Sequence, residues 1–256
     1  MTDDRFVIVE ELGAYARVRL NRPAQRNAMN SAARRALQDA LRDLQGAHHV
    51  IVITGADNSF CSGVDLKEAA AAPPSQRDVA GREWIDTLLA IRRHPAIFIA
   101  AVNGYALGGG ASLINACELA VAADEAEIGM PEITFGMYPA MAGPATQINL
   151  LPKHAAWMVL TGERIDGRRA AQWGMVNQSV PRADLQGAAD TLARHIAAFD
   201  AATLQESKRA LETVPSRINE WPTACDYGVQ VNATIQARRV ARAAGQAAAP
   251  QSKGAE

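Results

Sequence analysis

Three loops combine glycines with polar side chains, and each follows a segment typical of a strand. They are Phe60–Lys67, Asn103–Ser112 and Gly129–Ile133, the last running on to Pro139. Glycines just before a helix let backbone N–H groups approach a ligand, and the helix dipole favours negative charge there. We expect the first two loops to give one N–H group each to an oxyanion such as an enolate. The alternative is that Gly108–Gly110 only permit a tight strand-to-helix turn, and their spacing fits neither a Walker loop nor a Rossmann fingerprint.

Strand and helix patterns alternate around these loops. The predicted strands are Phe6–Glu11, Ala16–Leu20, Val50–Thr54, Ile97–Val102 and Leu119–Ala123, with a hairpin-like return to Ile128–Pro131. The predicted helices are a capped one from Asn30 or Ser31 to Leu44, then Arg77–Arg93, Ala111–Ala116, Pro152–Leu160, Asp166–Trp173, Leu185–Phe199, Thr203–Glu212 and a last one to about Arg242. We therefore predict a strand-rich body over 1–198, a helical region over 199–242 and a frayed, flexible tail over 243–256.

Composition places the chain among ordinary globular proteins. Its 256 residues are 48% apolar and 21% charged, which excludes a disordered or fibrous protein. The 26 basic and 27 acidic side chains leave a net charge of −1, so the positive field that nucleic-acid binding needs is missing. We expect no nucleic-acid partner.

The first residues and the cysteines indicate the compartment. Met-Thr-Asp-Asp-Arg is acidic and unlike a signal peptide, and no apolar run approaches the roughly 18 residues of a membrane span. Cys61, Cys117 and Cys225 are widely spaced, with no CxxC pair and no histidine at metal-ligand spacing. We predict a reduced, cytoplasmic protein without metal and without membrane contact, in which Cys61 is structural.

Six ordered motifs, which together cover about residues 5–240, resemble the enoyl-CoA hydratase/isomerase (crotonase) family. They are Asn21-Arg-Pro-Ala-Gln-Arg-Asn-Ala28, Thr54-Gly-Ala with Phe60-Cys-Ser-Gly-Val-Asp-Leu-Lys67, Ala101-Val-Asn-Gly-Tyr-Ala-Leu-Gly-Gly-Gly110, Met130-Pro-Glu-Ile133, Leu160-Thr-Gly-Glu163 and Gly174-Met-Val-Asn177. The resemblance implies an α/β fold, a crotonase (ClpP-like) spiral of β-β-α units with a helical C-terminal trimerisation region. It also implies an acyl-CoA thioester substrate, no separate cofactor because coenzyme A enters with the substrate, and assembly as a homotrimer or a dimer of trimers (a homohexamer).

The resemblance also assigns binding residues. The family's two oxyanion N–H positions match Val64 and Gly109, and the main chain around Ser62, Val64 and Leu66 would border the adenine and pantetheine arm. Many relatives have Lys-Arg where this chain has Gln25-Arg26, so one phosphate-facing charge is missing. Arg26 and Lys67 are the remaining phosphate candidates, although each could equally be a solvated surface charge.

Family hydratases carry two catalytic glutamates about 20 residues apart. The second matches Glu132, and the position of the first is occupied by Ser112. Cys117-Glu-Leu-Ala120 looks like a family motif but lies about six residues too late, so we interpret Glu118 as structural. The resemblance thus implies a single catalytic carboxylate, which suffices to carry a proton between carbons α and γ of an enoyl thioester. A hydroxyl such as that of Ser112 can only form hydrogen bonds.

Hydroxycinnamoyl-CoA hydratase-lyases also have serine at the position of Ser112, and an ungapped count sets Tyr227 where they bind a phenol. Tyr227 could instead be a packing residue of a C-terminal helix. The segment Gly136–Pro144 departs from the family pattern and carries bulkier residues, so we expect a reshaped pocket floor. Trp84, Trp157, Trp173 and Trp221 are expected in the core or an interface, and Arg34-Arg35 on an exposed helix face.

The sequence therefore predicts an enzyme of the enoyl-CoA hydratase/isomerase type with a backbone oxyanion hole and Glu132 as its single catalytic glutamate. Hydratase, isomerase and hydratase-lyase chemistry stay open. A further alternative is a non-catalytic acyl-CoA-binding scaffold.

Overall fold

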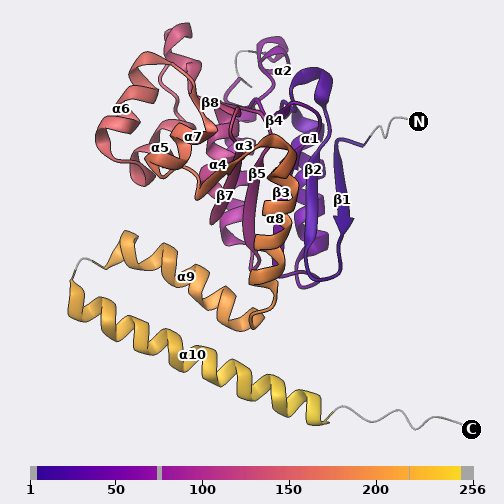
Figure 1. Cartoon of the computed structure of the whole chain (residues 1–256), viewed down its shortest axis with the longest axis vertical. Helices are drawn as coiled ribbons and strands as arrows, with labels where there is room; N and C mark the ends of the chain where they lie inside the picture. The colour runs from indigo at the N-terminus through magenta and orange to yellow at the C-terminus, as the bar shows by residue number, and fades with distance from the viewer. Residues whose placement is uncertain (1–4, 74–76, 219, 249–256) are drawn as a thin grey trace, which may run out of the picture. The chain divides into compact units, whose positions relative to one another are not determined.

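The computed structural model describes residues 5–73, 77–218 and 220–248, and the predicted tail beyond Ala248 lies outside them. The chain divides into two compact units, Met1–Ala198 and Phe199–Glu256, each considered by itself (Figure 1). The first unit contains both sheets and all of the strands described. The second is a helical hairpin.

The larger sheet of the first unit has six strands in the order β1-β2-β3-β5-β7-β10. β1 and β2 are antiparallel, and every other neighbouring pair is parallel. Every residue of the two central strands, β3 and β5, is buried, which explains their continuous apolar sequence. The strands are β1 Val7–Glu11, β2 Ala16–Leu20, β3 Val50–Gly55, β5 Ile97–Val102, β7 Leu119–Ala123 and β10 Gln178–Val180.

Four very short strands form a second sheet, in the order β4-β6-β8-β9. Its strands are β4 Ser59–Cys61, β6 Tyr105–Leu107, β8 Glu127–Gly129 and β9 Ile165–Asp166. Each of β3, β5 and β7 is followed by one strand of this sheet, so a β-β unit recurs three times. The predicted hairpin-like return after β7 is wrong, because β8 leaves the large sheet and pairs in parallel with β6.

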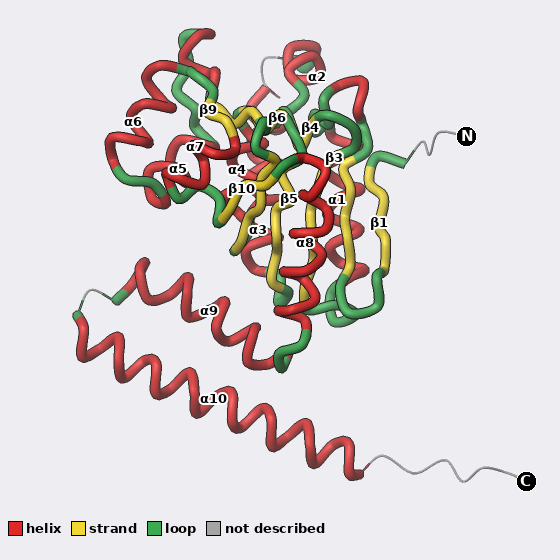
Figure 2. Tube along the Cα trace, viewed as in Figure 1, coloured by secondary structure: helices red, strands yellow, loops and turns green. Residues whose placement is uncertain are grey.

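Helices cover both faces of the large sheet (Figure 2). α1 packs on β1, β2 and α3, whereas α8 packs on β3, β5 and β7. The Asn30 side chain caps α1 by accepting a hydrogen bond from the Ala33 N–H, and Leu37, Leu41 and Leu44 form its buried face. The helices of this unit are α1 Ser31–Leu44, α2 Leu66–Ala71, α3 Arg77–Arg93, α4 Gly109–Ala116, α5 Ala142–Asn149, α6 Pro152–Thr161, α7 Gly167–Trp173 and α8 Arg182–Ala197, with short 3₁₀ turns η1 Pro23–Gln25 and η3 Pro131–Phe135.

The second unit consists of α9 Ala201–Arg217 and α10 Trp221–Ala248, which pack against each other. The prediction that the helix ends near Arg242 is wrong, because α10 continues to Ala248. The added segment lacks periodicity, but it is rich in alanine, which has the highest intrinsic helix propensity.

Candidate active site

Two glycine loops meet where the small sheet ends. A Cβ atom placed on Gly63 would lie 2.6 Å from the Gly109 nitrogen, and one on Gly110 would lie 1.9 Å from the Cys61 oxygen. Gly63 has a φ of +83°, a conformation that other residues rarely adopt. The loop after β4 and the first turn of α4 are therefore packed backbone against backbone, which only glycine permits.

This packing leaves two backbone N–H groups available. Gly109 is the first residue of α4, where an N–H has no partner within the helix. Met29 and Val64 form a parallel bridge, in which the Met29 N–H donates to Gly63 O and the Asp65 N–H donates to Met29 O. The N–H of Val64 itself therefore points away from Met29. Among the described residues, neither the Val64 nor the Gly109 N–H has a hydrogen-bond acceptor. The two predicted oxyanion donors are thus brought into adjoining loops.

Glu132 lies in η3, shortly after β8, and its carboxylate is held beside Gly108, the residue before the Gly109 donor. A Cβ atom on Gly108 would lie 2.7 Å from Glu132 Oε1, so the carboxylate rests against the glycine that precedes α4. Glu132 Oε2 is buried and has no hydrogen-bond partner among the described residues. Burial raises the pKa of the Glu132 carboxyl above its ordinary value, which makes the carboxylate a stronger base.

Ser112 lies one turn into α4 and is only 2% exposed. Its Oγ atom is also buried without a hydrogen-bond partner among the described residues, although a helical serine can bond the carbonyl one turn before it. Buried polar atoms in native proteins are nearly always paired. The oxygens of Ser112 and Glu132, each buried without a partner among the described residues, therefore each mark a point where a ligand or water is expected.

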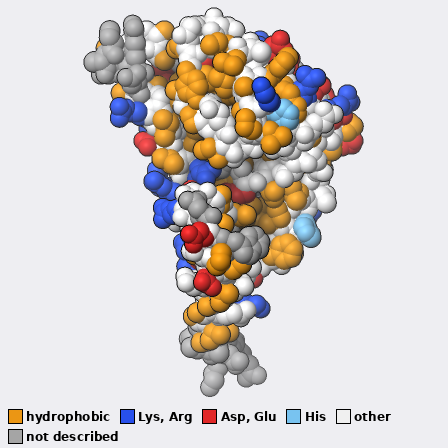
Figure 3. Space-filling view, turned by 90° about the vertical axis from the view of Figure 1, so that its left-hand side faces the viewer, with side chains coloured by type: hydrophobic (Ala, Val, Ile, Leu, Met, Phe, Trp, Pro, Cys, Tyr) orange, Lys and Arg blue, Asp and Glu red, His pale blue; other side chains and the backbone are white. Residues whose placement is uncertain are grey.

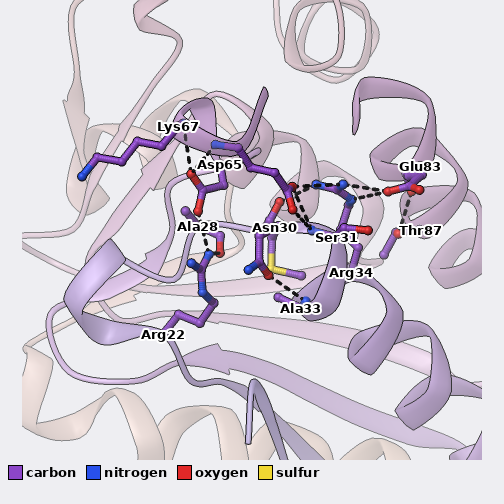
Figure 4. A network of polar contacts seen from close by, with 12 residues as sticks. Arg22, Ala28, Asn30, Ser31, Ala33, Arg34, Asp65, Lys67, Glu83 and Thr87 are labelled. Carbon is purple, nitrogen blue, oxygen red and sulfur yellow. Dashed lines mark hydrogen bonds and ion pairs between the residues drawn. The ribbon is translucent and has the colours of Figure 1, made fainter. Parts of the chain in front are cut away.

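A polar network fixes the loop that carries Val64 (Figure 4). Arg22 forms an ion pair of 3.0 Å with Asp65, whose side chain also caps α2 by accepting from the Lys67 and Glu68 N–H groups. Burial is the largest single influence and would raise the pKa of Asp65, but the hydrogen bond and charge of Arg22 together with the Glu68 and Lys67 N–H groups outweigh it, and the pKa is lowered. The carboxylate is thus charged and anchors the start of α2.

Arg34 extends this network, and its predicted exposure is wrong. The side chain is 3% exposed and pairs with Glu83 at 2.7 Å and with Glu68 at 3.4 Å. It also donates to Met29 O, next to the bridge with Val64. A charge in a helix pattern suggests exposure, but here α3 and α2 supply the carboxylates that permit burial.

The predicted coenzyme A contacts surround the same loop. The Ser62 N–H donates to Arg26 O, and its hydroxyl donates to Gln25 O. The exposed Arg26 guanidinium lies 4.8 Å from the centre of the Tyr105 ring, while Leu66 and Lys67 are exposed in the first turn of α2. The structure therefore places Ser62, Leu66 and Lys67 in or directly after the loop that carries Val64, and Arg26 next to it through the bond from Ser62. Tyr227 is half-buried on α10 in the second unit, so its role in binding stays a prediction.

Two rejected candidates have clear structural roles. Glu118 Oε2 accepts a hydrogen bond of 2.8 Å from the Phe98 N–H at the start of β5, whereas the glycine loops follow the other end of that strand. Cys61 is fully buried, and burial raises the pKa of its thiol to about 12. A thiol with that pKa is no nucleophile at neutral pH.

Within the part of the chain that the structure describes, no cluster of three or more histidine, cysteine or acidic side chains could hold a metal ion. No described helix is both long and apolar enough to cross a bilayer.

The repeated β-β units and the two glycine loops fit the enoyl-CoA hydratase/isomerase class that the sequence motifs resemble, and comparison with known proteins places the chain within it. Residues 10–244 match the family model described as enoyl-CoA hydratase/isomerase, and the chain belongs to that family, as an enzyme of the hydratase, isomerase or lyase type.

Individual relatives are similar over most of their length. The hydroxycinnamoyl-CoA hydratase-lyase of Pseudomonas fluorescens is 36% identical over 81% of this chain and 78% of its own. The 2,3-dehydroadipyl-CoA hydratase of Escherichia coli K12 is 37% identical over 75% and 76%. The crystal structure of a Bacillus anthracis enoyl-CoA hydratase superposes with a TM-score of 0.86 at 27% identity, over 98% of this chain and all of that one.

Sequence reasoning missed the role of Trp84, which it assigned only to the core or an interface. Trp84 is fully buried, as expected, but its Nε1–H donates a 3.3 Å hydrogen bond to Gly109 O. The available signal was weak: a buried indole N–H usually finds an acceptor, but the sequence cannot say which one.

Proposed function

We propose that this enzyme transforms enoyl-CoA thioesters by proton transfer through Glu132, with the enolate oxygen bound by the N–H groups of Val64 and Gly109. The observation that carries this proposal is the buried, unpartnered Glu132 Oε2 atom beside two unpaired N–H groups. A thioester carbonyl placed between the two donors would have its α-carbon near the carboxylate.

Each group then has a distinct part in the chemistry. Two N–H donors and the N-terminal end of α4 stabilise negative charge that develops on the thioester oxygen. The raised pKa of Glu132 suits a group that must both remove and return a proton. Ser112 has no second carboxylate to offer, so it acts by hydrogen bonding to water or to substrate. Glu132 alone can move a proton between carbons α and γ.

The test is Glu132→Gln, which deletes the proton carrier and preserves shape. Turnover of a panel of aliphatic and aromatic enoyl-CoAs, followed by mass spectrometry of the products, should be lost, while binding of CoA esters stays within several-fold. Near-normal turnover by this variant would refute the mechanism. CoA-ester binding by the wild-type enzyme without turnover of any panel member would instead favour the scaffold alternative.

A second candidate activity is hydration followed by retro-aldol cleavage of a hydroxycinnamoyl-CoA. It is supported by Ser112 in place of a second glutamate and by the 36% identity to a hydroxycinnamoyl-CoA hydratase-lyase. A para-hydroxyl group can delocalise charge, which compensates for the missing carboxylate. The same product panel separates the two activities, because cleavage releases an aromatic aldehyde and acetyl-CoA.

We also propose that the enzyme assembles as a homotrimer or a dimer of trimers in the cytoplasm. The helical hairpin leaves Leu211, Val229 and Val240 between 68% and 70% exposed. On the first unit, α5, α6 and the turn between them expose further apolar side chains, namely Ile148, Leu151, Trp157 and Leu160. Hydrophobic side chains are also frequent on the face of the molecule shown in Figure 3. Large exposed apolar patches are typical of interfaces. A monodisperse monomer in light scattering at micromolar concentration would refute the assembly.

A further inference from the structure

The side chain of Trp84 on α3 packs against Gly109 where the two glycine loops meet. A Cβ atom placed on Gly109 would lie 2.7 Å from Trp84 Nε1, 3.2 Å from its Cδ1 and 3.0 Å from the Gly63 Cα. The edge of the indole and the backbone of the Val64 loop therefore converge on the same point of Gly109. Trp84 is 0% exposed, so it has no freedom to move away from this point.

A hydrogen bond adds direction to this packing. The indole N–H donates to the Gly109 carbonyl at 3.3 Å, in the first turn of α4. Gly109 has no side chain of its own and follows Gly108, whose φ is +53°, so more backbone conformations are sterically accessible here than at other residues. Packing and hydrogen bonding from Trp84 restrict this freedom on the side of Gly109 that faces α3.

We propose that Trp84 is a positioning residue, which holds the Gly109 N–H at the distance and angle from the Val64 N–H that an enolate oxygen requires. This inference rests on the proposed function of the two N–H groups. Preorganised donors act in proportion to their fit to the developing charge, and a displacement of about 1 Å can lower a rate by about 10²-fold. Trp84 acts through Gly109 and makes no contact with substrate in this scheme.

The main test is Trp84→Phe, which removes the indole N–H and keeps an aromatic ring. We expect kcat to fall by roughly 10- to 100-fold, with KM changed less than about threefold. Loss of one oxyanion donor lowers kcat by about 10²–10³-fold, and the effect here should be smaller because the Gly109 N–H is displaced but still present. The control is Trp157→Phe on α6, at a side chain 44% exposed, which should leave kcat unchanged.

A spectroscopic readout distinguishes positioning from a purely structural role. Bound cinnamoyl-CoA should absorb at longer wavelength than the free thioester, because both N–H groups polarise its carbonyl. The red shift should be reduced in Trp84→Phe and retained in Trp157→Phe. If Trp84→Phe does not fold, incorporation of 3-benzothienylalanine at position 84 replaces the N–H with sulfur at nearly constant shape, and it should give the same two effects.

The outcomes separate this inference from the proposed function. If the wild-type enzyme shows neither turnover nor a red shift, the proposed function itself fails. If it shows both and the folded position-84 variants keep both, Trp84 is only a packing residue and the inference is overturned. A lower melting temperature with unchanged kcat and red shift has the same meaning.

Discussion

Replacing Ser112 with glutamate should give the site a second carboxylate and raise the hydration of a short, unactivated enoyl-CoA such as crotonyl-CoA. Ser112 is 2% exposed, and its hydroxyl oxygen has no described partner. It lies one helical turn from Gly109, so a longer acidic side chain at this position starts close to the proposed oxyanion donor. Two carboxylates can hold a water and divide the roles of base and acid.

The size of the gain follows from opposing terms. One well-placed acid or base contributes roughly 10²–10⁴-fold. Burial already raises the pKa of Glu132, and a second carboxylate beside it would raise the pKa of both groups. Misplacement of the water by about 1 Å would lower the rate by about 10²-fold. We therefore expect kcat/KM to rise by about 10-fold or more from a low base, at mildly alkaline pH. The assay is the loss of absorbance of the conjugated thioester.

Glu118→Gln is the matched control for this experiment. The variant keeps an oxygen that can accept from the Phe98 N–H at the start of β5, so turnover should be unchanged, and the free energy of unfolding should fall by only about 1 kcal/mol. Suppose instead that Glu118→Gln abolishes activity in a folded protein and Ser112→Glu has no effect. Glu118 would then be the second catalytic carboxylate, and the alignment of Ser112 with the family's first glutamate would be wrong.

Three further measurements test the surroundings of the site. Glu132→Gln should raise the melting temperature at neutral pH, because burial raises the pKa of this carboxyl and its charged form therefore destabilises the native state. The gain in melting temperature should shrink as the pH falls through the raised pKa, and a gain independent of pH would contradict the argument. Gly108→Ala should lower kcat at least about tenfold, because the φ of Gly108 is +53° and a Cβ atom there would lie 2.7 Å from Glu132 Oε1. Unchanged kinetics would show that the carboxylate does not lie against Gly108. Iodoacetamide should alkylate the exposed Cys225 long before Cys61, because Cys61 is buried and burial raises the pKa of its thiol to about 12. Peptide mass spectrometry measures the labelling, and equal labelling of both cysteines in the folded protein would refute the burial of Cys61.

The sequence by itself determined the main strands and helices of the body. β2, β5 and α3 have the predicted bounds, because the apolar runs and the amphipathic repeats that specify them are local. It also indicated the two glycine loops, for which a tight turn was the alternative, and Glu132 through the family resemblance. The family resemblance, now established, rested on the same local motifs.

Tertiary structure alone decided the surroundings of these residues. β4, β6 and β8 have three residues each, too few to show a period, so they form only because each finds a neighbouring strand. The burial of Arg34 depends on acidic side chains from α2 and α3, and the bond from Trp84 to Gly109 joins helices α3 and α4. Isolation of the Ser112 and Glu132 oxygens is likewise a property of what packs around them. Hydrogen bonding, burial and pKa depend on neighbours that are distant in the chain, and local sequence carries no record of which neighbours those are.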